Sequence, residues 1–394
     1  MKKRFGFPAL ALCCVVSIAL SILSCSWYFV NKLGGNECYS AASKFAAIYR
    51  IIEDKFVGDA DMELVSDYAY GAMVAATEDR WSYYMTAENY EDYKQFQNNS
   101  YIGIGISIAT EKSEGALKVE NVYPGSPAEA AGIKIGDRLK KINDMDISAM
   151  TSDEAKTIIA DQNGEEFSLE LLGTDGKTRS VKISAGEISI EPVESKMLED
   201  GVGYVKILNF ETGSGDKTVA AVDKLIAEGA TGLVFDLRNN PGGMLSELLK
   251  ALDHLLPEGV MFISKDSSGE ERESLSDAAC IDLPMAVLMN ENTYSAAEFF
   301  GAALSEAGKA TLVGTHTTGK SRSQISIELS DGSAVHLSTN GYLTPKHVDL
   351  AEAGGLAPDI EVKISEDAAA QIAARKLSPD KDEQLQKAIS ALKG

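Results

Sequence analysis

A long segment without charged side chains, residues 5–31, most limits what the beginning of this chain can form. Its 27 residues are enough to cross the hydrocarbon core of a membrane as a helix. Three basic residues, Lys2, Lys3 and Arg4, precede it, and such residues favour the cytoplasmic side. We therefore expect residues 1–31 to form a cytoplasmic tip and a transmembrane signal anchor, with the remaining chain outside the membrane.

The end of the apolar segment bears on whether it is cleaved. A cleaved signal peptide would have a shorter apolar run followed by small residues. Here the apolar character continues through Trp27, Tyr28 and Phe29, whose rings suit a membrane interface. The alternative is a lipoprotein signal, because I-L-S-C at residues 22–25 loosely resembles a lipobox that would place lipid on Cys25. Both interpretations tether the protein to the outer face of a membrane.

The composition excludes several classes of function. A net charge of −22 argues against nucleic-acid binding by the folded part, because attraction to phosphates needs clustered Lys and Arg. With 394 residues, 44% of them hydrophobic, the chain can form two or three packed domains. Outside the apolar segment the cysteines are Cys38 and Cys280, which make neither a disulfide framework nor a zinc motif. We expect no metal and no cofactor.

The middle of the chain changes character near residue 98. Residues 32–97 carry apolar side chains at helical spacing and predict a helical region, interrupted at W-S-Y-Y-M (81–85). Residues 124–143 then read P-G-S-P-A-E-A-A-G-I-K-I-G-D-R-L-K-K-I-N. This order of turn, short helix, glycine and strand resembles a PDZ domain of the bacterial protease type, over residues 98–184.

The PDZ resemblance implies a peptide-binding site. Such a domain binds a peptide C-terminus by strand addition, while backbone amides of a glycine-containing loop hold the carboxylate. The matching loop consists of Ile102, Gly103, Ile104 and Gly105. Alternatively, these glycines merely serve a β-turn.

The region from residue 185 to 394 begins with signs of a parallel sheet. Residues 232–238 (G-L-V-F-D-L-R) are typical of a buried parallel strand. The turn N-N-P-G-G (239–243) follows, and then one apolar face of a helix. A Gly-rich turn of this kind presents N–H groups to an anion and can serve as an oxyanion hole. It matches neither G-x-G-x-x-G nor a P-loop, which argues against nucleotide binding.

A second strand-to-helix junction contains Ser295. The apolar strand 285–290 leads into E-N-T-Y-S-A-A-E (291–298), and a helix follows. At such a junction a serine is exposed, and the N–H of its neighbour faces a developing negative charge. Taken alone, the pattern fits an ordinary N-cap serine better.

Three segments together resemble the C-terminal processing peptidases (tail-specific proteases, peptidase family S41). They are D-L-R-N-N-P-G-G (236–243), N-x-x-x-x-S-A-x-E (290–298) and T-x-G-K-x-x-x-Q (317–324). The resemblance covers nearly all of the chain after the apolar segment. It implies a multidomain α+β protein with a helical N-terminal region, a PDZ domain and an α/β serine protease core of the ClpP/crotonase type, ending in a helical tail.

The resemblance also assigns roles to single residues. Ser295 is the implied nucleophile, Lys320 the general base, and Gln324 the residue that orients the lysine. The family usually has alanine where this chain has Tyr294, which puts the local shape of the pocket in question. The candidate oxyanion-hole donors are the backbone N–H groups of Ala296, Gly242 and Gly243.

A lysine base needs an altered environment. At its usual pKa near 10.4 a lysine is protonated at neutral pH, whereas burial disfavours the charged form. Lys320 could then take the proton of Ser295 as the hydroxyl attacks, giving an acyl-enzyme that water hydrolyses. A histidine base is the alternative, and His316 is the tempting one, but no orienting carboxylate stands at a known spacing from it.

By this resemblance we expect a serine endopeptidase of the bacterial cell membrane, with its catalytic part outside. It would cleave proteins near their C-termini, and the PDZ domain would recognise the tail and gate activity. The expected partners are protein or peptide C-termini and the membrane, and a regulatory protein or a second copy of the chain stays open. The alternative from another class is a catalytically silent PDZ scaffold, against which the joint presence of Ser295, Lys320 and Gln324 argues.

Overall fold

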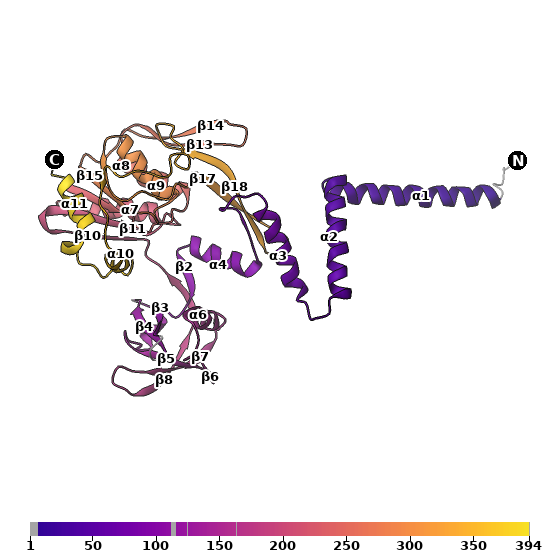
Figure 1. The fold of residues 1–394 in the computed structure, drawn as a ribbon, viewed down its shortest axis with the longest axis horizontal. Helices are drawn as coiled ribbons and strands as arrows, with labels where there is room; N and C mark the ends of the chain where they lie inside the picture. Colours follow the sequence, from indigo (N-terminus) through magenta and orange to yellow (C-terminus); the bar gives the residue numbers. More distant parts are fainter. Residues whose placement is uncertain (1–6, 112–115, 124, 163, 394) are drawn as a thin grey trace. The chain divides into compact units, whose positions relative to one another are not determined.

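The computed structural model describes residues 7–111, 116–123, 125–162 and 164–393 (Figure 1). The chain divides into two compact units, residues 1–78 and 79–394. The first unit consists of helices α1 (Phe7–Lys32), α2 (Asn36–Lys55) and α3 (Met62–Ala75). The helical character predicted for the start of the region after the apolar segment is therefore confirmed.

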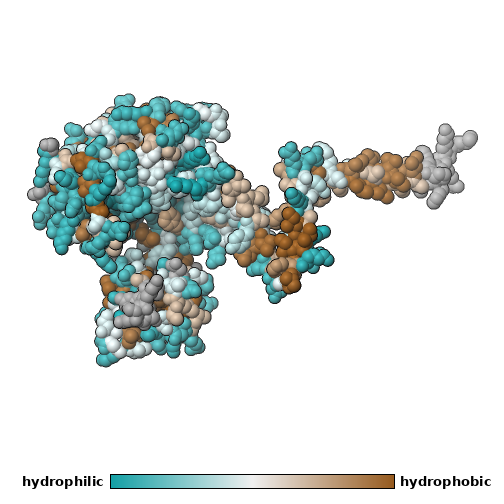
Figure 2. All heavy atoms as spheres, viewed as in Figure 1, coloured by the Kyte–Doolittle hydropathy of each residue, from teal (hydrophilic) through white to brown (hydrophobic). Residues whose placement is uncertain are grey.

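Helix α1 carries the uncharged segment. Within the described part of the chain, one helix is long and apolar enough to cross a membrane, over Ala11–Lys32, with a mean hydropathy of 2.0. None of the residues in that window is buried, and Figure 2 shows its surface as almost continuously hydrophobic. Such a surface is unfavourable in water, so the helix suits a membrane anchor or a signal sequence. The basic tip, residues 2–4, lies outside the described residues.

The second unit opens with elements that lead into a small β domain. Strand β1 (Tyr83–Met85) forms where W-S-Y-Y-M interrupts the helical pattern, and α4 (Ala87–Gln97) follows. Strand β2 (Ser100–Gly103) then enters the small domain and pairs antiparallel with β9 (Gly186–Ser189), on which the chain leaves it. The β2–β9 pair thus joins the small domain to the rest of the unit.

The small domain is the expected PDZ-like module. Its strands are β3 (Ile106–Glu111), β4 (Ala116–Val122), β5 (Arg138–Ile142), β6 (Met145–Asp146), β7 (Glu166–Leu172) and β8 (Thr178–Ser184). They form a sheet in the order β3-β4-β5-β7-β8, with β6 on β5, accompanied by helices α5 (Pro127–Ala130) and α6 (Ser152–Ala160). Its own core includes Leu117, Leu139, Phe167 and Leu169. Among the described residues β3 pairs only with β4, so β3 is an edge strand.

The larger domain is built on a mostly parallel sheet, in the order β10-β11-β12-β15-β16-β19. Its strands are β10 (Val193–Met197), β11 (Val202–Ile207), β12 (Gly232–Asp236), β15 (Met285–Met289), β16 (Ala310–Gly314) and β19 (Ile360–Glu361). Every residue of β12 and β15 is buried, as the continuous apolar runs predict. A 3-10 turn, η1 (Glu199–Gly201), precedes β11.

Alternate residues of these strands face two different cores. Leu233 and Phe235 of β12 pack in one core with helices α7 (Ser214–Ala227), α8 (Leu245–Leu255) and α9 (Ala296–Glu306). Val234, between them, belongs to a second core with Leu385 of helix α11 (Glu383–Ala391). Because strand side chains alternate between faces, the sheet is covered on both sides. The remaining helical elements are α10 (Glu366–Ala373) and η2 (Pro379–Lys381).

A second, antiparallel sheet lies beside α9. Its strands are β13 (Gly259–Lys265), β14 (Glu271–Ser276), β17 (Arg322–Glu328) and β18 (Ala334–Leu343), together with β1. β17 and β18 form an antiparallel hairpin, with Asp331 and Gly332 between the two strands. Phe262 of β13 meets Phe299 of α9 edge-on, with ring centroids 5.2 Å apart. The expected fold class, a multidomain mixture with a PDZ domain and an α/β core, is confirmed.

Candidate active site

Ser295 lies at the junction of strand β15 and helix α9, as the sequence predicts. Its φ and ψ are 57° and −129°, a conformation that is costly for a residue with a side chain. The residue is 7% exposed and precedes the first turn of α9, where the positive end of the helix dipole lies. Its hydroxyl makes no capping hydrogen bond to the described helix. Ser295 is therefore not the ordinary N-cap that the isolated pattern favours.

The carboxylate of Glu298 joins this junction to the segment that carries Lys320. Glu298 has no exposed surface, and its oxygens accept the N–H groups of Ser295 at 2.8 Å, Gly319 at 2.7 Å and Lys320 at 2.8 Å. The hydroxyl of Thr317 donates to it as well. Burial raises the pKa of Glu298, whereas these hydrogen bonds act in the opposite direction. Sequence reasoning quoted Glu298 only as a motif letter, although S-x-x-E before a helix is a capping-box signal.

Lys320 lies in a desolvated position beside aromatic rings. Burial lowers its pKa to about 8, against the opposing influence of Asp79 and Glu298. Its Nζ lies 4.5 Å from the ring centroid of Trp81 and 5.8 Å from that of Tyr294, two rings that stack on each other. Within the described residues no hydrogen bond joins Nζ to the Ser295 hydroxyl. Lys320 thus lines the same cavity as Ser295, but its Nζ lies over the aromatic rings.

Gln324 is in the same pocket but does not bond to Lys320. Its Nε2 donates to the Arg322 carbonyl at 3.1 Å and to the Ser338 hydroxyl at 2.9 Å. A register shift between Ser323 and Gln324 in the β17–β18 pairing accompanies this arrangement. The expected Gln–Lys hydrogen bond is therefore not formed here, because the amide is satisfied by its own hairpin. Motif spacing places the two residues together, but it does not determine their rotamers.

The turn 239–243 packs directly against the serine junction. A Cβ on Gly242 would stand 2.8 Å from the Cβ of Ser295, and one on Gly243 would stand 2.4 Å from the carbonyl carbon of Phe210. Both glycines also have positive φ, 90° and 145°. Only residues without side chains fit here.

The two glycines differ as oxyanion donors. The Gly242 N–H already donates to the side chain of Asn240 at 2.8 Å. Among the described residues no acceptor takes the N–H of Gly243 or of Ala296. Gly243 and Ala296 are accordingly the two free donors beside Ser295, whereas the sequence had left Gly242 and Gly243 equivalent.

These residues share one cavity of about 700 Å³. Its lining includes Ser295, Lys320, Gln324 and both glycines of the turn, as well as side chains that sequence reasoning missed. Among them are Tyr93, Glu211, Leu248, Phe262 and His336. They come from segments far apart in the sequence, and no motif assigned them to the site.

His336 is the histidine that the structure places in the cavity. Burial lowers its pKa to about 4, so it is neutral at physiological pH, and its Nδ1 is 2.9 Å from the hydroxyl of Ser326. Its ring packs on Tyr83 and Tyr93. His316, the histidine that the sequence favoured as an alternative base, is exposed.

Within the described residues, no group of three or more His, Cys, Asp or Glu side chains could hold a metal ion.

The predicted PDZ loop is divided between two environments. Ile102 and Gly103 belong to strand β2, and the Ile102 N–H donates to the Gln95 side chain at 2.9 Å. Ile104 is buried in the core of the small domain, and Gly105 has a φ of 81°. The loop ends where the edge strand β3 begins.

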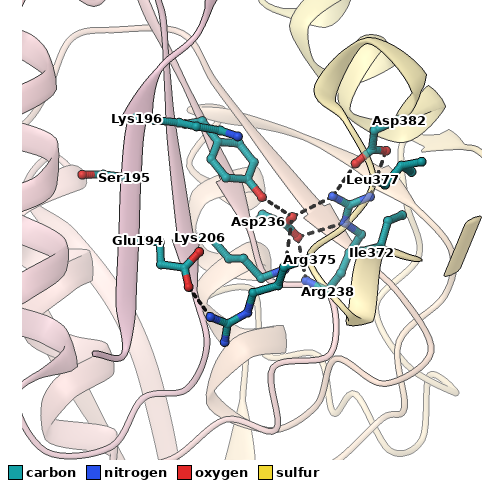
Figure 3. A pocket seen from close by; sticks show the side chains of 11 residues that line it. Glu194, Ser195, Lys196, Lys206, Asp236, Arg238, Ile372, Arg375, Leu377 and Asp382 are labelled. Carbon is teal, nitrogen blue, oxygen red and sulfur yellow. Dashed lines mark hydrogen bonds and ion pairs between the residues drawn. The ribbon is translucent and has the colours of Figure 1, made fainter. Parts of the chain in front are cut away.

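A second, charged pocket of about 250 Å³ lies near the end of β12, lined by residues from β10, β11 and the C-terminal helices (Figure 3). The Arg238 guanidinium bonds to Asp236 at 2.7 and 2.9 Å and to Asp382 at 2.7 and 3.0 Å. Tyr204 donates to Asp236 at 2.6 Å. Burial alone would raise the pKa of Asp236, but Arg238 and Lys206 hold it well below its usual range. This cluster fastens the start of α11 to the parallel sheet.

Comparison with known proteins decides the family. The model of peptidase family S41 matches residues 201–362, and the PDZ domain model matches residues 94–172. A carboxyl-terminal-processing protease of Picosynechococcus sp. is 31% identical over 296 residues, which cover 74% of this chain and 71% of that protein. This chain belongs to the C-terminal processing proteases of family S41. A C-terminal processing protease is a serine-type endopeptidase.

Other relatives agree with this assignment. The carboxy-terminal processing protease CtpA of Bacillus subtilis is 28% identical over 337 residues, covering 84% of this chain and 72% of that protein. A crystal structure of a putative S41 protease from Bacteroides fragilis aligns with a TM-score of 0.56 and 18% identity, over 82% of this chain and 88% of the other. At that identity the structural likeness supports the fold alone.

Proposed function

We propose that this C-terminal processing protease uses Ser295 as its nucleophile and neutral Lys320 as its general base. The observation that carries the proposal is the double attachment of Glu298. One carboxylate fixes both the backbone of Ser295 and that of Lys320, so the two side chains start from positions set by the same group. The lowered pKa of Lys320 supports its role, because a base must be neutral to accept a proton.

Catalysis requires one movement of Lys320. Its ammonium lies over Trp81 in the described arrangement, and the flexible side chain must turn so that Nζ reaches the Ser295 hydroxyl. The hydroxyl would then attack the peptide carbonyl as Nζ takes its proton, while the N–H groups of Ala296 and Gly243 stabilise the oxyanion. The C–N bond would break as Nζ returns the proton to the leaving amine, and water would hydrolyse the resulting acyl-enzyme. Gln324 would orient the neutral amine after giving up its bond to Ser338.

We further propose that the PDZ domain captures the C-terminus of the substrate and gates this movement. The edge strand β3 has a free side for strand addition, and α6 packs beside it. At the entry to the domain, Asn99 donates to the Thr212 carbonyl at 2.9 Å and accepts from Asn209 at 2.8 Å. The neighbouring Phe210 bonds in turn to Gly242 and Met244. These bonds offer a physical connection from the PDZ domain to the oxyanion turn.

Anchoring by α1 completes the proposal. The chain would consist of a tip and signal anchor (1–31), a helical region (32–97), a PDZ domain (98–184) and the protease core with its tail (185–394). The length and exposed apolar surface of α1 support the anchor, and its charge pattern supports an active site outside the bacterial cell membrane. Cys25 offers lipid attachment as the alternative tether. Intact mass measurement of the membrane-extracted protein distinguishes the two.

The test uses the full chain in detergent with an unstructured protein that ends in apolar residues. The wild type is expected to shorten it, whereas Ser295→Ala and Lys320→Ala should bind the tail without cutting. Cleavage by Lys320→Ala at the wild-type rate would remove the lysine from the mechanism. Binding without cleavage by the wild type would instead describe the silent scaffold.

A further inference from the structure

The cavity beside Ser295 contains a buried carboxyl group for which the proposed chemistry has no use. Glu211 is 6% exposed and lines the cavity, and among the described protein groups none donates a hydrogen bond to its Oε2. Leaving a buried carboxylate oxygen unpaired is costly unless a partner compensates it. Such a group calls for a bonding partner, and in a substrate cavity a group of the substrate can provide it.

The position of Glu211 is fixed by the backbone of the oxyanion turn. Phe210 donates to the Gly242 carbonyl at 2.7 Å, and the Met244 N–H donates to the Phe210 carbonyl at 2.7 Å. The Glu211 N–H is held at 3.0 Å by the side chain of Asn209. Phe210, the residue before Glu211, thus contacts the turn that lies beside Ser295. Because Glu211 and Ser295 line the same cavity, a substrate side chain that enters the cavity beside Ser295 can approach this carboxyl group.

The charges around Glu211 indicate what it would bind. Burial raises the pKa of Glu211 to about 7. The negative charge of Glu247 raises it as well, whereas the positive charge of Lys320 lowers it. Glu211 in turn raises the pKa of Tyr93 on α4. Glu247 is itself satisfied by the Gly215 N–H and Lys250. The positive charge of Lys320 therefore stabilises the ionised form of Glu211 in part. That charge is lost when Lys320 becomes neutral for catalysis, and a cation on the substrate would replace it.

The rest of the cavity suits the stem of a long side chain. Leu248, Phe262 and Tyr342 give it apolar walls, and Glu211 is the one carboxylate among the described residues that line it. An aliphatic chain with a positive end fits such a combination, because its stem packs on apolar surface while its head pairs with the carboxylate.

We propose that Glu211 determines specificity by binding a lysine or arginine side chain of the substrate next to the scissile bond. This inference rests on the proposed function, since it names the substrate class of the same site. Glu211 would select substrates without touching the reacting atoms. Peptides with a carboxylate at that position would be disfavoured by repulsion.

The test compares peptides that share an apolar C-terminus and carry Lys, Ala or Glu at each of the residues flanking the cleaved bond. At pH 8 the full-length wild type is expected to cleave the best Lys peptide with a kcat/KM at least about tenfold above its Ala counterpart, since a hydrogen bond between charged groups is stronger than one between neutral groups. Glu211→Gln should bring the Lys/Ala ratio close to one. Glu273→Gln, an exposed carboxylate on β14, is the matched control and should leave the ratio unchanged.

A measurement of peptide binding tests the role of Glu211 separately from the catalytic proposal. In the Ser295→Ala background, affinity for the Lys peptide should exceed that for the Ala peptide, and adding Glu211→Gln should abolish the difference. Equal ratios in the wild type and Glu211→Gln, in both cleavage and binding, would overturn the role of Glu211. So would an equal loss for all peptides, which would indicate a structural role or a pairing with Lys320. Absence of cleavage with the binding preference intact would count against the proposed catalysis alone.

Discussion

At the scale of single residues, the lowered pKa of Lys320 leads to a prediction about pH. A base is active when it is neutral, so the active fraction grows as the pH rises through about 8. We expect kcat/KM to rise about tenfold per pH unit below that value and to level off above it. Peptide cleavage from pH 6 to 10 measures this, with Ser295→Ala as the inactive control. A profile that falls across this range would exclude a lysine base.

The ring of Trp81 gives a second prediction at the same scale. A cation over an aromatic face is stabilised by about 0.5–2 kcal/mol, and this favours the protonated lysine. Trp81→Leu keeps the site apolar but removes the ring face, so the midpoint of the pH profile should move down by about 0.4–1.5 units. Trp81→Phe retains a face and should shift it less. An upward shift in Trp81→Leu would mean that the ring acts mainly by excluding water.

The sequence predicted which residues share the site, but not their contacts. The family resemblance implied that Ser295 and Lys320 act together, and both line one cavity. It could not predict that Trp81 would lie beside Lys320, since that contact arises from long-range packing. The position of Glu211 in the cavity could not be predicted for the same reason. The bond of Gln324 to Ser338 depends on a register shift that the hairpin pattern does not encode.

At the scale of elements, Glu298 fixes the start of α9 to the loop that carries Lys320. Glu298→Gln preserves the shape of the side chain but replaces one carboxylate oxygen by an NH2 group. That group cannot accept a hydrogen bond from the backbone N–H groups that the carboxylate binds. We expect kcat to fall by at least about 100-fold, because small displacements of reacting groups are that costly. Glu306→Gln, at the other end of α9 with one backbone bond to Lys346, should change kcat little. Circular dichroism separates lost activity from lost fold.

The attachment of α11 gives another prediction at this scale (Figure 3). Asp382→Ala removes two bonds to the buried guanidinium of Arg238 and the cap of α11, and should lower the free energy of unfolding by about 3 kcal/mol. Urea titration measures this, with the exposed Asp380→Asn as control. Because the pKa of Asp236 is depressed, its stabilising contribution is present above its ordinary pKa and lost as the pH falls below it. An unchanged unfolding midpoint in Asp382→Ala would show that α11 docks through apolar packing alone.

At the scale of the whole molecule, the PDZ-like domain was expected from a family resemblance, and the PDZ and S41 models match the chain in that order. The continuous apolar runs indicated the buried parallel sheet. What no pattern could supply is how one domain communicates with the other. We propose that it depends on Asn99, whose side-chain amide donates to the Thr212 carbonyl and accepts from Asn209.

Asn99→Gly tests this connection without disturbing the backbone, because glycine accepts a positive φ. The variant loses the side-chain bonds to Thr212 and Asn209. If these bonds couple tail capture to the oxyanion turn, peptides with a free C-terminus should lose the advantage that they hold over amidated peptides in the wild type. Coupling of about 1–3 kcal/mol predicts a drop in this ratio of at least about fivefold. Asn143→Gly, the same exchange at another Asn with a φ of 51°, should leave the ratio intact. A preserved ratio in Asn99→Gly would mean that the tail acts only by tethering the substrate, which raises its local concentration without changing the active site.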